Sequence, residues 1–330
     1  MSTAFDRTAP TLLTTAPQPI RWNRPLLALA AIMALLTVFA LIARFVSPVE
    51  ITGLNQWDKP LKFSLSVIIY AVTWSWLLGQ LQRAQRIAWI AGTVIAVTLI
   101  VEMVVIVWAA ASGQTSHFNV STPLNTTMWA VMAVSISILW GATFVGAALL
   151  FFSRLGDPAR AVAIRSGAVI CLLGLALGYL MTDPTEAQLK DFQGIAGAHA
   201  VGVADGGPGL PILGWSTVGG DLRVPHFVGM HALQAVPLVL IALELLSRRL
   251  TLLRDVRLRV RLVWISAVSY LGLVVIVTWQ ALRGQSIVNP DGPTLAAGAS
   301  LAVAATVAVL VVIARGARRG TAVPAERETH

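Results

Sequence analysis

The chain has 330 residues, of which 56% are hydrophobic and 12% charged, and its formal net charge is +9. A soluble domain is about a quarter charged, so this composition excludes an ordinary water-soluble enzyme. The basic balance does not indicate nucleic-acid binding, because the arginines flank apolar segments instead of clustering with aromatic residues. The single cysteine, Cys171, lies inside an apolar run and excludes an intramolecular disulfide.

Residues 1–24 are polar and rich in threonine and proline, and we expect them to form a disordered cytoplasmic N-terminus. Apolar runs of about 20 residues, long enough to cross about 30 Å of hydrocarbon, then recur along the chain. They are 25–46, 60–81, 87–111, 128–152, 162–181, 226–246, 262–282 and 294–314. The first run is too long for the core of a signal peptide. The sequence therefore predicts an all-α polytopic membrane protein with eight transmembrane helices.

The basic residues indicate the orientation of these helices. Most of the 24 lysines and arginines fall in segments that share one side of the membrane with the N-terminus, and 248–261 alone holds six arginines. Basic residues mark cytoplasmic loops, so we expect both termini in the cytoplasm, with 315–330 as a cytoplasmic tail. The composition, rich in alanine, arginine and valine, and the short loops favour a bacterial inner membrane, with the lipid bilayer as partner.

Two pairs of motifs indicate an internal repeat. Two predicted helices end in tryptophan, four residues, glycine and glutamine, at 108–114 and 279–285. Two others open with an acid, a base, a proline and then a basic residue followed by phenylalanine, at 58–63 and 221–227. Because four spans return the chain to its starting side, we expect two four-helix halves in parallel orientation. These halves are 25–152 and 162–314.

Glu102 is the most informative single residue. It lies in the run VTLIVEMVVIVW, about nine residues from the outer end of the third predicted helix, and so about 14 Å deep. A lone carboxyl group there costs a few kcal/mol, so we expect it to be paired, neutral or facing a polar cavity. The repeat places Leu273 at the matching position of the second half, which favours a single asymmetric site. The alternative is a structural glutamic acid hydrogen-bonded to a neighbouring helix.

The segment 219–234 is the densest polar stretch at a helix start. Asp221 and Arg223 are close enough in sequence to form an ion pair at this start. His226 and His231 lie about 140° apart around a helix, so a metal ion bound by both would need a ligand from another helix. The alternative is an ion-paired helix start with interfacial histidines.

The loop 183–225 is the longest predicted connection, and we expect it outside the cell. Its first residues predict a short helix with Asp183 as N-cap and Glu186 as the capping-box acid. The following part, 194–220, is rich in glycine and typical of a lid over a site. His117 lies in another polar outer loop, where a solvated surface histidine is the alternative to a functional one. Nothing resembling a nucleophile motif surrounds Ser216, which disfavours a hydrolytic triad.

Together these residues predict an outward-facing polar site beneath the segment 194–220. The candidate catalytic residues are Glu102, Asp221, Arg223, His226 and His231. The candidate metal ligands are His117, His226, His231 and Glu102, since histidine and carboxylate groups bind metals and transfer protons. Three classes of function stay open: a membrane-embedded enzyme that uses a metal ion or haem, a proton-coupled transporter of small solutes, and a non-catalytic accessory protein. The ligand would be a small or lipid-soluble molecule.

Overall fold

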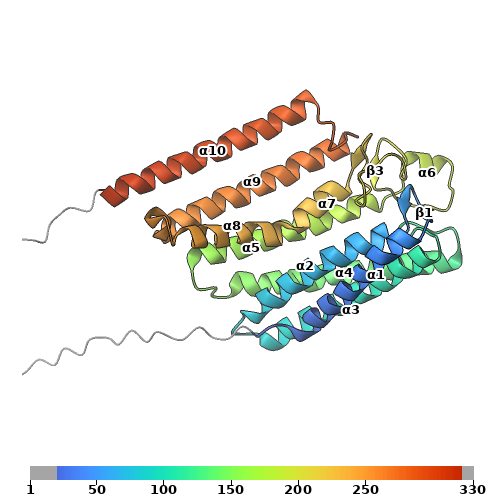
Figure 1. Ribbon diagram of the computed structural model, residues 1–330, viewed down its shortest axis with the longest axis horizontal. Helices are drawn as coiled ribbons and strands as arrows, with labels where there is room; N and C mark the ends of the chain where they lie inside the picture. Colours follow the sequence, from blue (N-terminus) through green and yellow to red (C-terminus); the bar gives the residue numbers. More distant parts are fainter. Residues whose placement is uncertain (1–20, 322–330) are drawn as a thin grey trace, which may run out of the picture.

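The computed structural model describes residues 21–321, and over this range the chain is almost entirely helical (Figure 1). The long helices are α1 (Arg24–Val46), α2 (Asp58–Gly79), α3 (Gln85–Ala111), α4 (Pro123–Phe152), α5 (Pro158–Leu177), α9 (Val256–Leu282) and α10 (Gly292–Thr321). Seven helices of this range are long and apolar enough to cross a membrane. The chain is therefore an all-α, multi-pass membrane protein. The predicted disordered segment and tail lie mostly outside the described residues.

The predicted helix at 226–246 is broken in two. Its parts are α7 (Arg223–Met230) and α8 (Ala232–Leu246), which meet at His231 with a bend of 43°. Together they pass the same test of length and hydropathy as a single span, which raises the number of candidate spans to eight.

Short elements fill the connections. They are the hairpin β1 (Glu50–Ile51) and β2 (Leu54–Asn55), the 3-10 turns η1 (Gly178–Met181) and η2 (Thr251–Arg254), α6 (Glu186–Lys190), and the antiparallel pair β3 (Ala200–Val201) and β4 (Gly220–Asp221). In the two pairs, Glu50 lies opposite Asn55 and Ala200 lies opposite Asp221. The prediction that Asp183 caps α6 is wrong. Thr185 is the N-cap, because its hydroxyl accepts from the backbone of Gln188, whose side chain accepts in return from the Thr185 N–H.

Local sequence explains where the long helices begin. Asn23, Thr122 and Asp157 each accept a hydrogen bond from a backbone N–H of the first turn of α1, α4 and α5. A proline follows each cap within the first two helical positions, where its missing N–H removes no helix hydrogen bond.

The tryptophan–glycine–glutamine motifs are helix ends. After α3, Gly113 adopts a φ of 67°, and the N–H of Gln114 donates to the carbonyl of Ala109. After α9, Gly284 adopts a φ of 73°, and the N–H of Gln285 donates to the carbonyl of Gln280. Glycine reaches this left-handed conformation without strain, so the same local chemistry ends both helices.

The helices pack in two sets that are consecutive in the chain. In the first, α2 contacts α1 and α3, α3 contacts α4, and α1 also contacts α3. In the second, the α7–α8 pair contacts α5 and α9, α9 contacts α10, and α5 also contacts α9. The two sets meet where α4 contacts α5. The described chain begins and ends at one end of the bundle, and α6 and the strands lie at the other (Figure 1).

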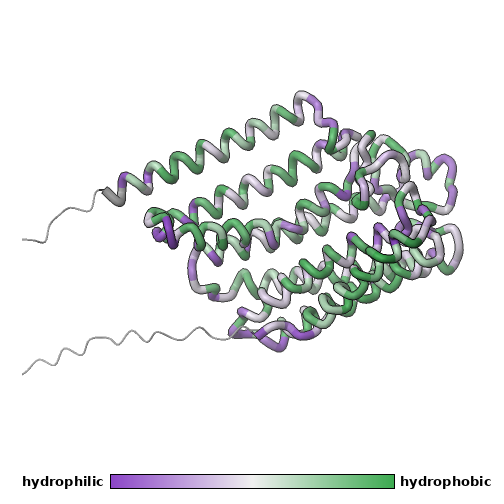
Figure 2. Tube along the Cα trace, in the orientation of Figure 1, coloured by the Kyte–Doolittle hydropathy of each residue, from purple (hydrophilic) through white to green (hydrophobic). Residues whose placement is uncertain are grey.

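Hydrophobic residues cover the sides of this bundle, and hydrophilic residues gather at its two ends (Figure 2). Many large apolar side chains on the outside are exposed, among them Phe45, Leu35 and Val104. A water-soluble fold would bury such surface, whereas lipid covers it in a membrane. The largest buried cluster lies among α1 to α5 and includes Leu29, Trp74 and Leu150.

Candidate functional site

A cavity of about 1560 Å³ lies among α2, α3, α4 and α7, toward the end of the bundle that carries α6 and the strands. Residues of the 183–225 connection cover it, and we call this cover the roof. Most of the lining is apolar and aromatic. The titratable residues that line it are Lys59, Lys62, Tyr70, Glu102, His117, Tyr179, Asp183, Glu186, His199, Asp205, Arg223 and His226.

The cavity brings together most of the site residues predicted from sequence. Glu102, Arg223, His226 and His117 line it directly. Asp221 and His231 are not part of the lining, but each contacts a residue that is. Asp221 forms an ion pair with Arg223, and the Nε2 atom of His231 lies 3.4 Å from the hydroxyl of Ser66.

Asp221 and Arg223 hold the roof on the start of α7. Both carboxylate oxygens of Asp221 accept from Arg223, over 2.9 Å from Nε and 2.5 Å from Nη2. Asp221 also accepts from the backbone N–H of Ser216, while Arg223 donates to the carbonyl of Gly214. Asp221 is buried and fully engaged by these bonds, so the pair has a positioning role for the roof segment.

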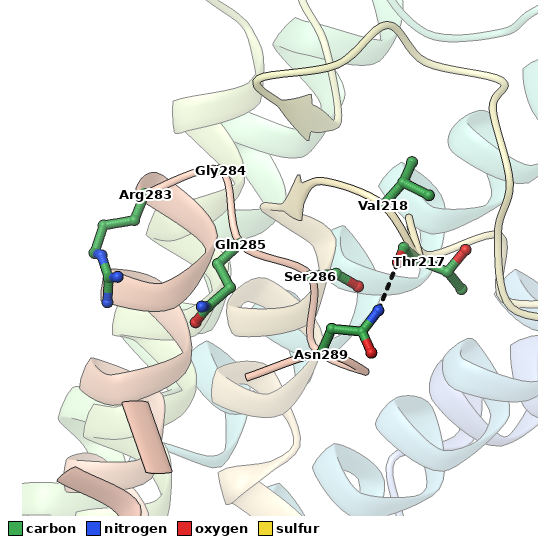
Figure 3. A pocket seen from close by; sticks show the side chains of 7 residues that line it. All are labelled: Thr217, Val218, Arg283, Gly284, Gln285, Ser286 and Asn289. Atoms are coloured by element: carbon green, nitrogen blue, oxygen red, sulfur yellow. Dashed lines mark hydrogen bonds between the residues drawn. The ribbon is translucent and has the colours of Figure 1, made fainter. Parts of the chain in front are cut away.

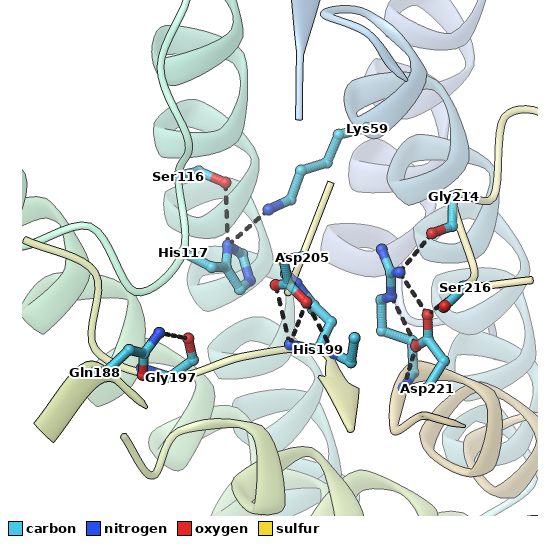
Figure 4. A network of polar contacts seen from close by, with 12 residues as sticks. Lys59, Ser116, His117, Gln188, Gly197, His199, Asp205, Gly214, Ser216 and Asp221 are labelled. Carbon is cyan, nitrogen blue, oxygen red and sulfur yellow. Dashed lines mark hydrogen bonds and ion pairs between the residues drawn. The ribbon is translucent and has the colours of Figure 1, made fainter. Parts of the chain in front are cut away.

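A histidine–aspartate pair in the roof was not predicted from the sequence. The Nδ1 atom of His199 lies 2.7 Å from a carboxylate oxygen of Asp205, and the N–H groups of His199 and Ala200 donate to the same carboxylate (Figure 4). Because an ionised carboxylate only accepts, the His199 proton lies on Nδ1 and its Nε2 is free to accept.

The charge states of this pair follow from its surroundings. Burial lowers the pKa of His199 to about 4, although the hydrogen bond to Asp205 acts in the opposite direction. Burial acts to raise the pKa of Asp205, but the hydrogen bonds from His199 and Ala200 prevail and lower it to about 2. At neutral pH the pair therefore consists of a neutral imidazole oriented by a carboxylate, which is the arrangement of a general base.

Lys59 and His117 form a second polar pair at the same cavity. The ammonium nitrogen of Lys59 lies 3.1 Å from Nδ1 of His117 (Figure 4). An ammonium group only donates, so Nδ1 accepts and the proton of His117 lies on Nε2. Burial first, and then the positive charge of Lys59, hold the pKa of His117 well below its usual value. The centres of the His117 and His199 rings are 6.4 Å apart. The His117 ring thus offers a hydrogen-bond donor, Nε2–H, and the His199 ring offers an acceptor, Nε2.

His226 is fixed by the close approach of α5 and α7. Its Nδ1 atom donates to the carbonyl of Gly174 over 2.8 Å, so its unprotonated nitrogen is Nε2. Gly174 lies against the backbone of Gly229, where a Cβ atom would clash, and a Cβ on Gly178 would lie 3.1 Å from the His226 ring. Gly174 of α5 and Gly178 of η1, which are four residues apart, therefore make room for α7 and its histidine.

Glu102 lines the cavity and is only 7% exposed, yet its Oε1 atom has no hydrogen-bond partner among the described residues. Lys59 is the charged residue that acts on it electrostatically. Its neighbours along the cavity wall, Leu99, Met103 and Ile106, are apolar. A buried polar atom without a partner is rare in folded proteins and costs about 1–3 kcal/mol.

The predicted metal ligands do not form a metal-binding group in the described part of the chain. No three histidine, cysteine, aspartate or glutamate side chains between residues 21 and 321 lie close enough to hold a metal ion. His226 is engaged with a backbone carbonyl, and Nδ1 of His231 donates to the side chain of Gln234 over 3.2 Å. The geometry of these residues thus does not support the predicted metal site. Haem binding stays a prediction.

A second, polar pocket of about 530 Å³ lies where the connection after α9 meets the roof (Figure 3). Asn289 donates to the carbonyl of Thr217, and the buried hydroxyl of Ser286 donates to the carbonyl of Ser216. Arg283 forms an ion pair with Asp291 and lies over the ring of Trp279. These side chains already form hydrogen bonds and an ion pair with protein groups. We therefore assign this pocket a structural role, which is to attach the roof to the connection after α9.

Comparison with models of known protein families, with curated proteins and with solved structures finds no match.

Proposed function

We propose that the chain is an inner-membrane protein with eight spans in two parallel four-helix halves, both termini cytoplasmic. The bent α7–α8 pair counts as one span in this proposal. Support comes from the packing of equivalent helices. The principal contacts of the second set match those of the first if α5 corresponds to α1, α7–α8 to α2, α9 to α3 and α10 to α4. The matching ends of α3 and α9 agree with this pairing. In this orientation the roofed end of the cavity faces the outside of the cell.

We further propose that the cavity is the active site of a membrane-embedded enzyme that transfers protons. The observation that carries the proposal is the pairing of His199 with Asp205 in the same cavity as the pair of Lys59 and His117. His199 acts as general base through Nε2, and Asp205 keeps the imidazole in the required tautomer. Lys59 and the Nε2–H of His117 stabilise negative charge that develops on the substrate, as donors fixed in advance do in other enzymes.

The other predicted site residues have distinct roles in this proposal. Glu102 and His226 present polar atoms to the bound substrate. Asp221 and Arg223 position the roof, and His231 lies at the break between α7 and α8.

The bent pair α7–α8 is the observation that favours the second candidate, a proton-coupled transporter, because transporters place broken helices at their binding sites. A transporter also needs a polar path to the opposite face. Fully buried apolar side chains fill the ends of α1, α2 and α4 that lie away from the roof, and among them are Leu29, Trp74 and Leu150. No polar path is therefore seen there among the described residues. This packing favours the enzyme.

The test uses purified protein in vesicles made from bacterial polar lipid extract, with all lipids compared by mass spectrometry before and after incubation. The wild-type protein should convert one lipid component. His199→Gln should slow this conversion by about 10²–10⁴-fold, the usual contribution of a general base. Asp205→Asn should slow it less, and Glu244→Gln, which breaks the ion pair with Arg160 at the end of the bundle away from the roof, should leave it unchanged. Conversion that His199→Gln does not slow, or no conversion by the wild type, would refute the proposal.

A further inference from the structure

The cavity reaches the side of the bundle as well as its roofed end. Part of its lining comes from α4 and η1, and among these residues Ile136 is 37%, Tyr179 44% and Leu180 43% exposed. Ser137 on α4 is exposed too. These residues carry no charge, and we call this opening between α4 and η1 the side portal.

The side portal lies at the depth of the membrane. Ser137 is in the middle of α4, a helix of 30 residues. Such a helix is about 45 Å long, which exceeds the roughly 30 Å of hydrocarbon in a bilayer. In the proposed topology the middle of α4 therefore faces lipid tails. The other border, η1, follows the outer end of α5, so the side portal lies in the outer half of the membrane and a molecule that passes it comes from the bilayer.

Two hydrogen bonds frame the side portal. The hydroxyl of Tyr179 donates to the hydroxyl of Ser137 over 3.0 Å and crosses the opening. One helical turn further along α4, the indole N–H of Trp140 donates to the carbonyl of Leu172 over 3.2 Å and joins α4 to α5. The first bond links two exposed side chains, and rotation of either one breaks it without disturbing the backbone.

The roof, in contrast, is fastened at several points. Lys62 donates to the carbonyl of Leu213 over 2.6 Å, and Arg223 donates to Gly214. Gly206 of the roof also packs closely on Gly53 in the β1–β2 turn: a Cβ atom on Gly53 would lie 2.8 Å from the carbonyl oxygen of Gly206. Access through the roof requires breaking these contacts together, whereas access through the side portal requires breaking one hydrogen bond between hydroxyl groups.

Inside the cavity, Glu102 is a hydrogen-bond partner for a polar group of a ligand. Glu102 is more than nine-tenths buried, lines the cavity and has no hydrogen bond to Oε1 from the described residues. The charged residues of the lining belong mostly to the roofed end, whereas Glu102 lies on a wall formed by apolar side chains of α3, among them Leu99, Met103 and Ile106. This part of the cavity therefore fits a ligand that is mainly hydrocarbon and carries a hydrogen-bonding group for Glu102.

We propose that the cavity takes a lipid-soluble molecule with a hydroxyl group, which enters from the bilayer through the side portal and hydrogen-bonds to Glu102. This inference rests on the proposed function, since the ligand would be the substrate.

The test uses proteoliposomes that contain a long-chain fatty alcohol with a photoreactive diazirine on its chain. After illumination, mass spectrometry measures labelling of cavity peptides that contain Met103 and Met132. Ser137→Trp places an indole in the side portal and should reduce this labelling by about tenfold or more, equivalent to about 1.4 kcal/mol. The matched control is Val134→Trp on the same helix, at a position that is 60% exposed and not part of the cavity lining. It should label like the wild type.

Glu102 is tested with the same probe. Glu102→Leu should reduce cavity labelling by about three- to tenfold, the effect of one hydrogen bond. Glu102→Gln, which still offers a donor and an acceptor, should keep most of it. The proposal is overturned if Ser137→Trp labels like the wild type, if Val134→Trp reduces labelling equally, or if Glu102→Leu has no effect.

The labelling experiment is independent of catalysis. His199→Gln should lose conversion of lipid and still label like the wild type. If Ser137→Trp and the wild type label equally while His199→Gln abolishes conversion, the side portal is wrong and the enzyme proposal stands. If labelling follows the side portal but no lipid is converted, the binding route stands and the enzyme proposal fails.

Discussion

Replacing Glu102 by leucine should make the protein more stable. The wild-type side chain is 7% exposed, and its Oε1 atom has no hydrogen-bond partner in the described residues, so folding removes a polar group from water without replacing its hydrogen bond. The cost of such a group is about 1–3 kcal/mol. Leucine is similar in size, keeps the contacts of the side-chain stem and carries no polar atom. We therefore expect Glu102→Leu to raise the free energy of unfolding by about 1–3 kcal/mol.

The assay is reversible unfolding in mixed detergent micelles, followed by tryptophan fluorescence, with each variant compared with the wild type. Thr98→Val is the matched control, one turn earlier on α3. The Thr98 side chain is also buried, but its hydroxyl donates to the carbonyl of Val94 over 2.9 Å, so its removal should give no gain. Glu102→Leu should at the same time reduce labelling of the cavity by about three- to tenfold, because a polar residue that binds a ligand is often kept at a cost in stability. A loss of stability of 1 kcal/mol or more on Glu102→Leu would refute this reasoning and favour the structural interpretation of Glu102.

Three further predictions concern topology, pH and helix packing. A cysteine at Leu189, which is 74% exposed on α6, should react with an impermeant maleimide on intact cells, and one at Arg254 only after permeabilisation; the reverse pattern would invert the proposed orientation. The pKa of His199 is about 4 in the native state and 6.5 in the unfolded state, so the unfolded state binds the proton at a higher pH as the solution is acidified. The free energy of unfolding should therefore be highest above pH 6.5 and fall by about 2–3 kcal/mol toward pH 4, and His199→Gln should flatten this slope; equal slopes in acid denaturation curves would contradict the assignment. Gly174→Ala should lower stability by about 1–3 kcal/mol because its Cβ would clash with the backbone of α7, whereas Gly141→Ala, with open space around it, should raise stability by about 0.5–1 kcal/mol in the same unfolding assay. Equal effects of the two glycine substitutions would show that α5 and α7 do not touch as described.

The helical membrane fold was predictable because its causes are local. An apolar run of about 20 residues is sufficient to specify a span, whatever the rest of the chain does. The starts of α1, α4 and α5 follow from a capping residue and a proline within a few positions. The ends of α3 and α9 follow in the same way from Gly113 and Gly284. The break at His231 was not predicted, although it also has local causes: Gly229 lies two residues before it, and Pro237 removes the helix hydrogen bond to the carbonyl of Leu233.

Glu102 could be singled out from sequence because a carboxyl group inside a long apolar run is costly in any arrangement of the helices. Its partners could not be. His199 and Asp205 lie six residues apart in a glycine-rich loop, a spacing that no regular element turns into a contact; the backbone path of the roof alone brings them to 2.7 Å. Lys59 and His117 come from different elements and meet only when α2 and the connection after α3 pack around the cavity. Sequence determined what must lie in the membrane, because transfer of each segment into lipid depends on that segment alone. Tertiary structure decided which polar groups share a site, because that depends on contacts between segments far apart in the chain.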